Sequence, residues 1–370
     1  MKISVIVPLY HGKKYINQII KQLEDCVKQL TYPISVELIF QNDLPEDKIE
    51  DSYYSKFVDV LIFNTSINRG IHGARVQGLN NCSGDYILFL DQDDEIFPLY
   101  IESQYSKIGD ADAIVCRVNN GGKYHYTNTF VFEEVVTKEF MLNNWCSIIS
   151  PGQVLIRKNA IPLLWKENVL QNNGADDYFL WLAMMAEDAE IVLNQDVLFF
   201  HTLNGVNTSN NTNMMMDSEI EMISILKENK VFDGDDKKLL EKLPDSLRRI
   251  HVKQLDIQNK CLFLMQNLIK RLKQGENVFK ELSHKNIKKI AIYGAGIIGR
   301  NIKELLCFCG IDVFCFIDQN AEFIDTDIWV YTKFNAPEDI DFIILTIEDD
   351  ELKRELEEIC KCKVKYIKDI

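Results

Sequence analysis

Four carboxylates follow directly on a short apolar run, residues 86–90, in the sequence YILFLDQDDE. The apolar run predicts a buried strand, and Asp91, Asp93, Asp94 and Glu95 come at its carboxyl end. Clustered carboxylates repel one another and are costly to desolvate unless a positive charge lies among them. A hard divalent cation such as Mg²⁺ or Mn²⁺, held by one or two carboxylates together with substrate phosphates, meets that need. The alternative is a solvated strand-to-helix turn in which an Asp caps the helix.

A second acidic pair, Asp176 and Asp177, comes directly before an apolar stretch, residues 178–186, that predicts a helix. The dipole of that helix would favour ionisation of a carboxylate at its N-terminus. An ionised carboxylate within reach of a hydroxyl group can act as a general base. The pair therefore has two interpretations, a catalytic base or a simple stabilisation of the helix terminus.

Strands and helices alternate along the first 90 residues. Apolar runs predict strands at residues 3–9, 35–40, 58–63 and 86–90, and helical periodicity appears at residues 15–30 and 73–81. This alternation predicts an α/β fold with a mostly parallel sheet, in which ligands bind at the carboxyl ends of the strands. Because Asp91 and Asp93 are two residues apart, we expect both to face the ligand while Gln92 points away.

Composition excludes several classes of protein. The 370 residues are 46% hydrophobic and 26% charged, which is typical of a globular protein of two or three domains. A net charge of −15 argues against nucleic acid as the main partner. The ten cysteines are scattered, some of them in apolar runs (Cys116, Cys315), as suits a reducing cytosol. The first residues read as a strand and not as a signal peptide, and no run of about 18 apolar residues predicts a spanning helix.

Six ordered pieces of the sequence resemble the family-2 glycosyltransferases, which bind nucleotide sugars in a domain of the GT-A fold. They are SVIVPLY, QND, NRGIHGARVQG, SGDYILFLDQDD, SPGQVLIRKNAI and NGADDYFLWLAMM. The resemblance implies a GT-A domain over residues 1–212. The chain departs from the family pattern at Asn42, Val76 and Ala183, where the family often has an acidic residue, an Asn and an Arg.

The resemblance also implies a role for each matching residue. The nucleotide sugar would be bound by Pro8, Tyr10, Asp43, Asn68, Arg75 and Asp91. The metal ion, Mn²⁺ or Mg²⁺, would be bound by Asp93 and Asp91, with either His201 or Asn204 nearby. The general base would be Asp177, beside Asp176.

The remainder of the chain predicts two further parts. Residues 213–285 have long helical periodicity, broken near Pro244, whose apolar positions suit a helical hairpin or a dimer face. Residues 286–370 predict a small Rossmann-like module, because Gly294, Gly296 and Gly299 form a G-x-G-x-x-G between a strand and a helix, and Asp318 ends the next strand. These glycines either bind a nucleotide or serve helix–strand packing alone.

We therefore expect a cytoplasmic, metal-dependent and inverting glycosyltransferase that acts in the synthesis of a cell-surface polysaccharide or glycan. Its partners would be a nucleoside diphosphate sugar and a glycan or lipid-linked acceptor. A homodimer and a peripheral contact with the inner face of the membrane stay open, the latter because Lys260, Lys270, Arg271 and Lys273 lie beside apolar residues. The alternatives are a sugar-nucleotide oxidoreductase or epimerase that uses the C-terminal glycines, and a non-catalytic scaffold that binds sugar nucleotides.

Overall fold

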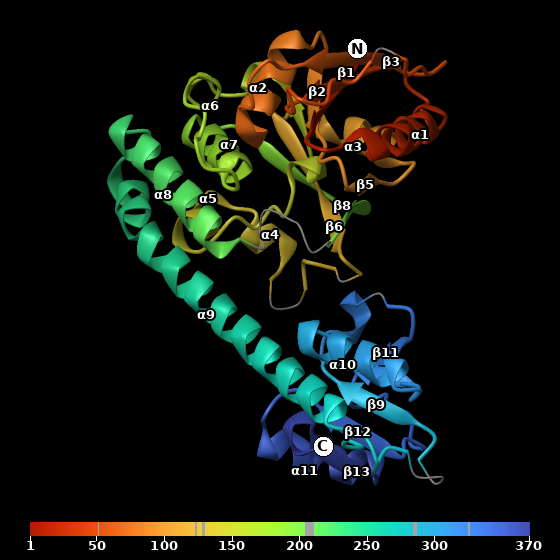
Figure 1. Cartoon of the computed structure of the whole chain (residues 1–370). Helices are drawn as coiled ribbons and strands as arrows, with labels where there is room; N and C mark the ends of the chain where they lie inside the picture. Colours follow the sequence, from red (N-terminus) through yellow and green to blue (C-terminus); the bar gives the residue numbers. More distant parts are fainter. Residues whose placement is uncertain (51, 123, 128–129, 204–210, 284–286, 325) are drawn as a thin grey trace. The chain divides into compact units, whose positions relative to one another are not determined.

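The computed structural model describes residues 1–50, 52–122, 124–127, 130–203, 211–283, 287–324 and 326–370 (Figure 1). Contacts divide the chain into two units. The first comprises Met1–Gly121 and Thr129–His251, and the second comprises Gly122–Asn128 and Val252–Ile370. The boundary near residue 251 falls within the long helix α9 (Gly234–Lys273). The three-part division at residues 212 and 285 stays a prediction.

The first unit is built on an eight-stranded sheet with the order β3-β2-β1-β4-β7-β6-β8-β5. Strands β1 to β4 are parallel to one another, so their carboxyl ends meet at one edge, whereas β7 is antiparallel to both of its neighbours. The mostly parallel α/β architecture expected from the sequence is confirmed. The strands are β1 (Lys2–Leu9), β2 (Ser35–Asn42), β3 (Asp59–Asn64), β4 (Tyr86–Phe89), β5 (Glu95–Ile96), β6 (Ala113–Asn120), β7 (Val154–Arg157) and β8 (Ile191–His201).

Helices of the first unit bury apolar faces against this sheet and against one another. Helix α7 begins at Asp176, and all but two of its eleven residues are buried, as its run of aromatic and aliphatic residues requires. It packs against α5, α6 and α8. The helices are α1 (Ile16–Val27), α2 (Gly70–Asn81), α3 (Tyr100–Ile108), α4 (Phe132–Val135), α5 (Lys138–Asn143), α6 (Leu163–Glu167), α7 (Asp176–Ala186) and α8 (Thr212–Glu228).

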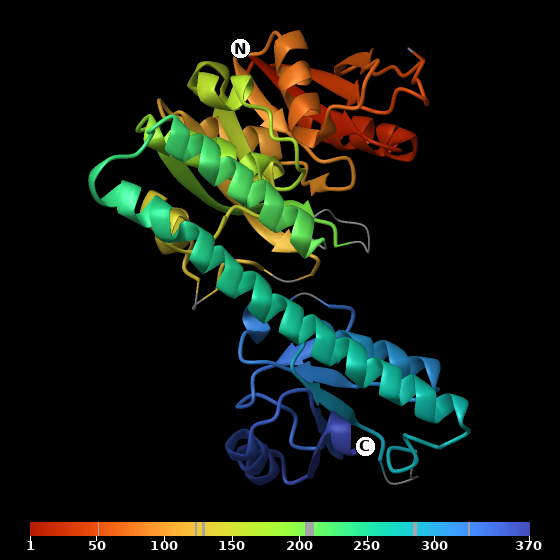
Figure 2. The same ribbon diagram turned by 60° about the vertical axis from the view of Figure 1, so that its left-hand side comes forward.

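The second unit contains a five-stranded parallel sheet with the order β11-β10-β9-β12-β13. The first strand of this unit, β9, therefore lies at the centre, and the order matches the first five strands of the doubly wound dinucleotide fold. The C-terminal part of α9 packs on one face of this sheet together with α10 (Figure 2), while α11 packs on the other face. The elements are β9 (Ile290–Tyr293), α10 (Ile297–Phe308), β10 (Cys315–Ile317), β11 (Trp329–Tyr331), β12 (Phe342–Leu345), α11 (Asp350–Cys360) and β13 (Lys363–Tyr366).

Helix α9 is one continuous helix of 40 residues with Pro244 inside it. The expected break near Pro244 is therefore wrong. Proline removes one backbone hydrogen bond and crowds the preceding turn. Leu240, Leu243 and Leu247 are buried on both sides of it, and this packing holds the helix together despite that cost.

Two further observations concern the cysteines and the apolar character of the helices. All ten cysteines are free, and Cys116 in β6 and Cys315 in β10 are fully buried as expected. Within the described ranges, no helix combines the length and the apolar character that crossing a membrane requires.

Candidate functional site

A cavity of about 820 Å³ opens in the first unit at the carboxyl ends of β1, β2 and β4. Parallel strands direct the residues that follow them to the same edge of the sheet, so segments far apart in the sequence meet here. Ten residues of the first unit that have a role implied by the family resemblance line this cavity: Pro8, Tyr10, Asp43, Asn68, Arg75, Asp91, Asp93, Asp176, Asp177 and His201. The structure thus brings them together, while their individual roles stay predictions.

Arg75 lies in α2 and bridges two carboxylates of the cavity. Its Nη1 donates to Asp176 Oδ2 and its Nη2 donates to Asp91 Oδ1, each at 2.5 Å. The side chains of Arg75 and Asp176 are both 3% exposed. Burial alone would lower the pKa of Arg75, but the charges of Asp176 and Asp91 outweigh it and raise that pKa. The guanidinium therefore fixes the orientation of one acidic residue after β4 and of one at the start of α7.

Asp177 is the second residue of α7 and faces the cavity beside this ion-pair network. Burial, followed by the negative charge of Asp176, raises the pKa of Asp177 to about 7, although Arg75 and the backbone N–H of Tyr178 act in the opposite direction. The sequence predicts that the helix dipole favours ionisation of this carboxylate. Burial and the neighbouring carboxylate prevail over the dipole here. A carboxylate with a pKa near 7 is matched to proton abstraction at neutral pH.

Asp94 is buried and holds His201 in place. Its Oδ1 lies 2.9 Å from His201 Nδ1 and accepts a hydrogen bond from the backbone N–H of Thr202, and its Oδ2 accepts one from Ser150 Oγ. Burial alone would lower the pKa of His201, but the hydrogen bond and the charge of Asp94 outweigh it and raise that pKa. With Nδ1 engaged, Nε2 is the His201 nitrogen left for a ligand. The alternative candidate, Asn204, lies outside the described residues.

The residues after β4 suit a hard cation only together with a substrate. Asp91 and Asp93 both line the cavity, but the described part of the chain contains no cluster of three or more His, Cys, Asp or Glu side chains arranged to hold a metal ion. Mg²⁺ characteristically keeps few protein ligands and completes its coordination with substrate phosphates and water. A pair of carboxylates at an open cavity fits a cation that arrives with a diphosphate.

Backbone contacts shape the part of the cavity near β1 and β2. The carboxylate of Asp43 accepts hydrogen bonds from the backbone N–H of Arg69 at 2.9 and 3.1 Å, and so holds the loop that carries Asn68. Gln92 exchanges two hydrogen bonds with the backbone of Tyr10, at 3.0 and 3.1 Å, and lines the cavity itself. The expectation that Gln92 points away is wrong, because its amide connects the loops after β1 and β4.

The sequence did not reveal Glu219, a carboxylate of α8 that also lines the cavity. It is 7% exposed, and its Oε2 accepts a 2.7 Å hydrogen bond from His251 Nε2 of α9. Met215 of α8 and Cys146 line the same part of the cavity. Nothing in the spacing of these residues forms a motif, and only the packing of α8 beside α7 reveals them. Asp94 was recognised as a member of the acidic cluster, but nothing in the sequence indicated that it would hold His201.

In the second unit, Gly294 and Gly296 lie between β9 and α10, and Gly299 lies in the first turn of α10. Gly294 has a φ of +96°, which favours glycine, and a Cβ at Gly299 would lie 1.9 Å from Gly294 O. Both positions therefore require glycine for backbone geometry and for close packing of α10, whereas Gly296 has open space around it. Asp318 Oδ2 accepts a hydrogen bond from the backbone N–H of Ala295 at 2.9 Å. Nucleotide binding at this turn stays a prediction.

Comparison with protein families identifies a domain in the first part of the chain. Residues 4–162 match the family described as Glycosyl transferase family 2. These residues form a family-2 glycosyltransferase domain. The match contains β1 to β4, Arg75 and the acidic residues after β4, and it ends before Asp176 and Asp177.

Two curated relatives of this glycosyltransferase domain come from bacteria. Glycosyltransferase GlyA of Streptococcus pneumoniae is 26% identical over 249 residues, which are 61% of this chain but only 34% of that protein. An uncharacterized glycosyltransferase of Haemophilus influenzae is 29% identical over 208 residues, which are 54% of this chain and 76% of that protein. A solved structure, S. aureus TarS 1–349 in complex with UDP-GlcNAc, is 15% identical with a TM-score of 0.48, and the match covers 66% of this chain and 71% of that chain.

Proposed function

We propose that the chain transfers a sugar from a nucleoside diphosphate sugar to a hydroxyl group of a glycan or lipid-linked acceptor, in the synthesis of a cell-surface polysaccharide or glycan. The observation that carries this proposal is a single cavity, formed partly by the family-2 domain, that is lined both by Asp91 and Asp93 and by Asp177. The first two carboxylates serve the donor diphosphate, and the third serves the acceptor. The free cysteines agree with a cytoplasmic location.

The donor occupies the side of the cavity next to β1, β2 and β4. Asp43, Asn68 and the backbone at Pro8 and Tyr10 contact the base and ribose, and Asp91 contacts the ribose or the metal ion. When bound, Mn²⁺ or Mg²⁺ offsets the charge that develops on the leaving diphosphate. Asp93 and Asp91 would hold that ion, and His201 Nε2 would be available to the ion or to the diphosphate. Arg75 keeps Asp91 oriented and adds positive charge at the cavity wall.

Asp177 acts as the general base. It takes the proton of the acceptor hydroxyl while that oxygen forms a bond to the anomeric carbon and the bond from this carbon to the diphosphate oxygen breaks. The nucleoside diphosphate leaves with the electron pair of the broken bond. Because the displacement occurs in one step, the anomeric configuration inverts. Asp176 is engaged by Arg75 and positions the start of α7.

The acceptor occupies the side of the cavity next to α8. Glu219 places a carboxylate there, held by His251 on Oε2, so that Oε1 can accept hydrogen bonds from hydroxyl groups of an acceptor. Like charges disfavour an anionic group at this position. The part of the acceptor that contacts Glu219 is therefore a neutral, hydroxyl-bearing group.

The test is a thermal-shift screen of nucleoside diphosphate sugars with and without Mn²⁺, followed by measurement of nucleoside diphosphate release. We expect at least one donor to raise the melting temperature only when Mn²⁺ is present, and to be hydrolysed slowly. Glu219→Gln should leave this release unchanged and should alter transfer to an added glycan. Oxidation or reduction of a nicotinamide cofactor without nucleoside diphosphate release would overturn the proposal in favour of an oxidoreductase. Binding without any release would indicate a scaffold.

A further inference from the structure

The part of α9 that belongs to the second unit has two different faces. Leu268 is buried in the core of the unit, and Leu264, Met265 and Leu272 pack partly buried beside it. Seven other residues, alternately three and four positions apart, are all exposed, and we call them the outer stripe. They are Val252, Leu255, Asn259, Leu262, Gln266, Ile269 and Lys273.

The outer stripe has the spacing of a coiled-coil seam. Its period is 3.5 residues over three heptads, with Leu255, Leu262 and Ile269 at d positions and the other four residues at a positions. The three d side chains are 37%, 56% and 41% exposed. Branched apolar residues repeated at the d positions of an exposed helix are the pattern that a second helix covers.

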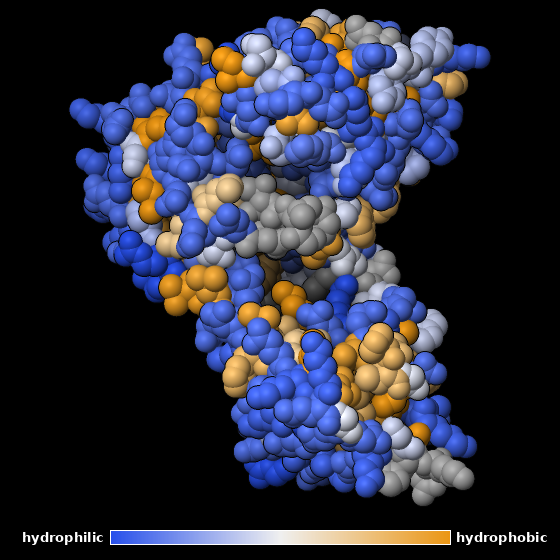
Figure 3. Space-filling model, viewed as in Figure 1, coloured by the Kyte–Doolittle hydropathy of each residue, from blue (hydrophilic) through white to orange (hydrophobic). Residues whose placement is uncertain are grey.

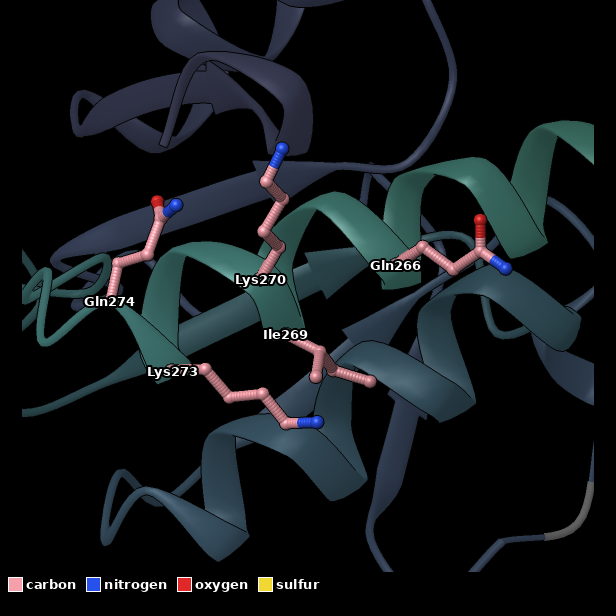
Figure 4. A pocket seen from close by; sticks show the side chains of 5 residues that line it. All are labelled: Gln266, Ile269, Lys270, Lys273 and Gln274. Carbon is pink, nitrogen blue, oxygen red and sulfur yellow. The ribbon is translucent and has the colours of Figure 1, made fainter.

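The outer stripe lies on an open surface. In Figure 3, apolar and hydrophilic side chains are interspersed along the course that α9 takes in Figure 1. Toward the end of α9, an open hollow of about 390 Å³ is lined by three residues of the stripe together with Lys270 and Gln274 (Figure 4). Such a hollow between side chains at a and d positions can receive an apolar side chain of a facing helix.

The polar residues of the outer stripe indicate what covers it. Asn259 lies between Leu255 and Leu262, and Gln266 lies between Leu262 and Ile269. Burial of these amides among lipid acyl chains would cost free energy because they would lose hydrogen bonds. An amide both donates and accepts, so it is complementary to a copy of itself. An Asn at an a position is also a known determinant of register in parallel two-stranded coils.

We propose that a second copy of this chain covers the outer stripe, with the two α9 helices parallel and in register. Leu255, Leu262 and Ile269 then each contact the same residue of the other copy, and the amides at positions 259 and 266 pair across the twofold axis. Lys253, Lys260 and Arg271 fall at b and f positions, away from the partner, so that most of the positive charge of this segment stays solvated. This proposal does not depend on the transfer reaction.

The test is sedimentation velocity of the full chain at increasing concentration. We expect a dimer that dissociates on dilution. Leu262→Asp removes two leucines from each dimer and places two like charges in the seam, so its dimer dissociation constant should rise by about 100-fold or more. Ile257→Asp is the matched control, because Ile257 is 44% exposed on the same helix at an f position, and it should dimerise as the wild type does.

Two further measurements decide the partner and the orientation. Leu262→Cys should form a symmetric disulfide dimer on mild oxidation, in excess of what the wild type and Ile257→Cys form through their native cysteines. A wild type that stays monomeric, or a dimer that Leu262→Asp leaves unchanged, would overturn the proposal. So would a monomeric wild type that sediments with vesicles containing anionic lipid and loses this binding in Leu262→Asp, since the stripe would then contact membrane.

Discussion

At the scale of single residues, the carboxylates of the cavity depend on one buried cation. Arg75 neutralises Asp176, which has almost no contact with solvent, and holds Asp91 at the rim of the cavity. Removal of one partner from a buried ion pair leaves an uncompensated charge in a medium of low polarity. The stability of the first unit and the geometry of its acidic residues are therefore linked through the same side chain.

Arg75→Met should destabilise the protein strongly. The substitution keeps an apolar stem of similar length but leaves Asp176 buried without a partner, which typically costs about 3–5 kcal/mol in the free energy of unfolding. Urea denaturation of the full chain measures this loss. Arg248→Met is the control, because the Arg248–Asp245 pair is exposed and contributes less than about 1 kcal/mol. Equal stability of the two variants would contradict the role given to Arg75.

Asp177→Asn should abolish most transfer without weakening donor binding. The amide cannot take a proton, so the rate should fall by roughly 10²–10⁴-fold, the usual effect of losing a general base. In the wild type, transfer should rise with pH and level off above about 7, where Asp177 is ionised. Steady-state kinetics across pH measure both effects. A pH profile that the substitution leaves unchanged would show that another group is the base.

Transfer should rise with pH, whereas the raised pKa of Asp177 makes the free energy of unfolding fall as the pH rises. Because Asp177 titrates near 7 in the folded state instead of near 3.8, the folded protein holds a proton that the unfolded chain releases between these values. The contribution of Asp177 to stability therefore falls as pH rises through this window. The free energy of unfolding of Asp177→Asn, relative to that of the wild type, should therefore increase as the pH rises from about 4 to 7. Asp176→Asn should instead lose stability, because Arg75 loses a charged partner.

At the scale of elements, substitutions in the second unit test the roles of its glycines. A Cβ at Gly299 would meet the carbonyl oxygen of Gly294 at 1.9 Å, so Gly299→Ala must push α10 away from the turn after β9. Forced shifts of this kind cost about 1–3 kcal/mol. Gly296→Ala meets nothing within 4 Å at a φ of −78°, and should change the free energy of unfolding by less than about 0.5 kcal/mol. Thermal denaturation of the two variants checks the difference. A Gly299→Ala variant as stable as Gly296→Ala would refute the packing role.

Individual elements show how much of the fold and of the site could be predicted from the sequence. The apolar runs that became β1 and β4 were predicted to within a residue, because a buried parallel strand leaves an uninterrupted hydrophobic signature. Strands β11 and β13 were not predicted, since β11 has only three residues and β13 alternates two lysines with apolar residues. Pro244 predicted a break that leucine packing overrides. Asp43 and Asp93 could be placed at the sheet edge because a parallel sheet has one ligand-binding edge, whereas Glu219 comes from a helix whose position the sequence does not specify.

At the scale of the whole molecule, the two units should separate by function. A chain that ends at residue 255 retains every described residue that lines the cavity, and should bind the donor as the full chain does. A chain that ends at residue 285 exposes Leu268, Phe279 and Leu282, which pack in the second unit, and should aggregate. Calorimetric titration and size-exclusion chromatography measure these outcomes. A folded short chain that no longer binds the donor would show that the second unit contributes to the site.

We expect Asp93 and its neighbours to bind a nucleoside diphosphate sugar through a divalent cation. Isothermal titration of the donor found in the screen into the wild type, Asp93→Ala and the surface control Asp59→Ala, each with Mn²⁺ and with EDTA, tests it most directly. Asp93→Ala should lose the Mn²⁺-dependent part of the affinity, while its melting temperature without metal holds or rises because carboxylate repulsion is relieved. Asp59→Ala, at an exposed position at the start of β3, should bind as the wild type does. An Asp93→Ala variant with unchanged Mn²⁺-dependent affinity would contradict the account.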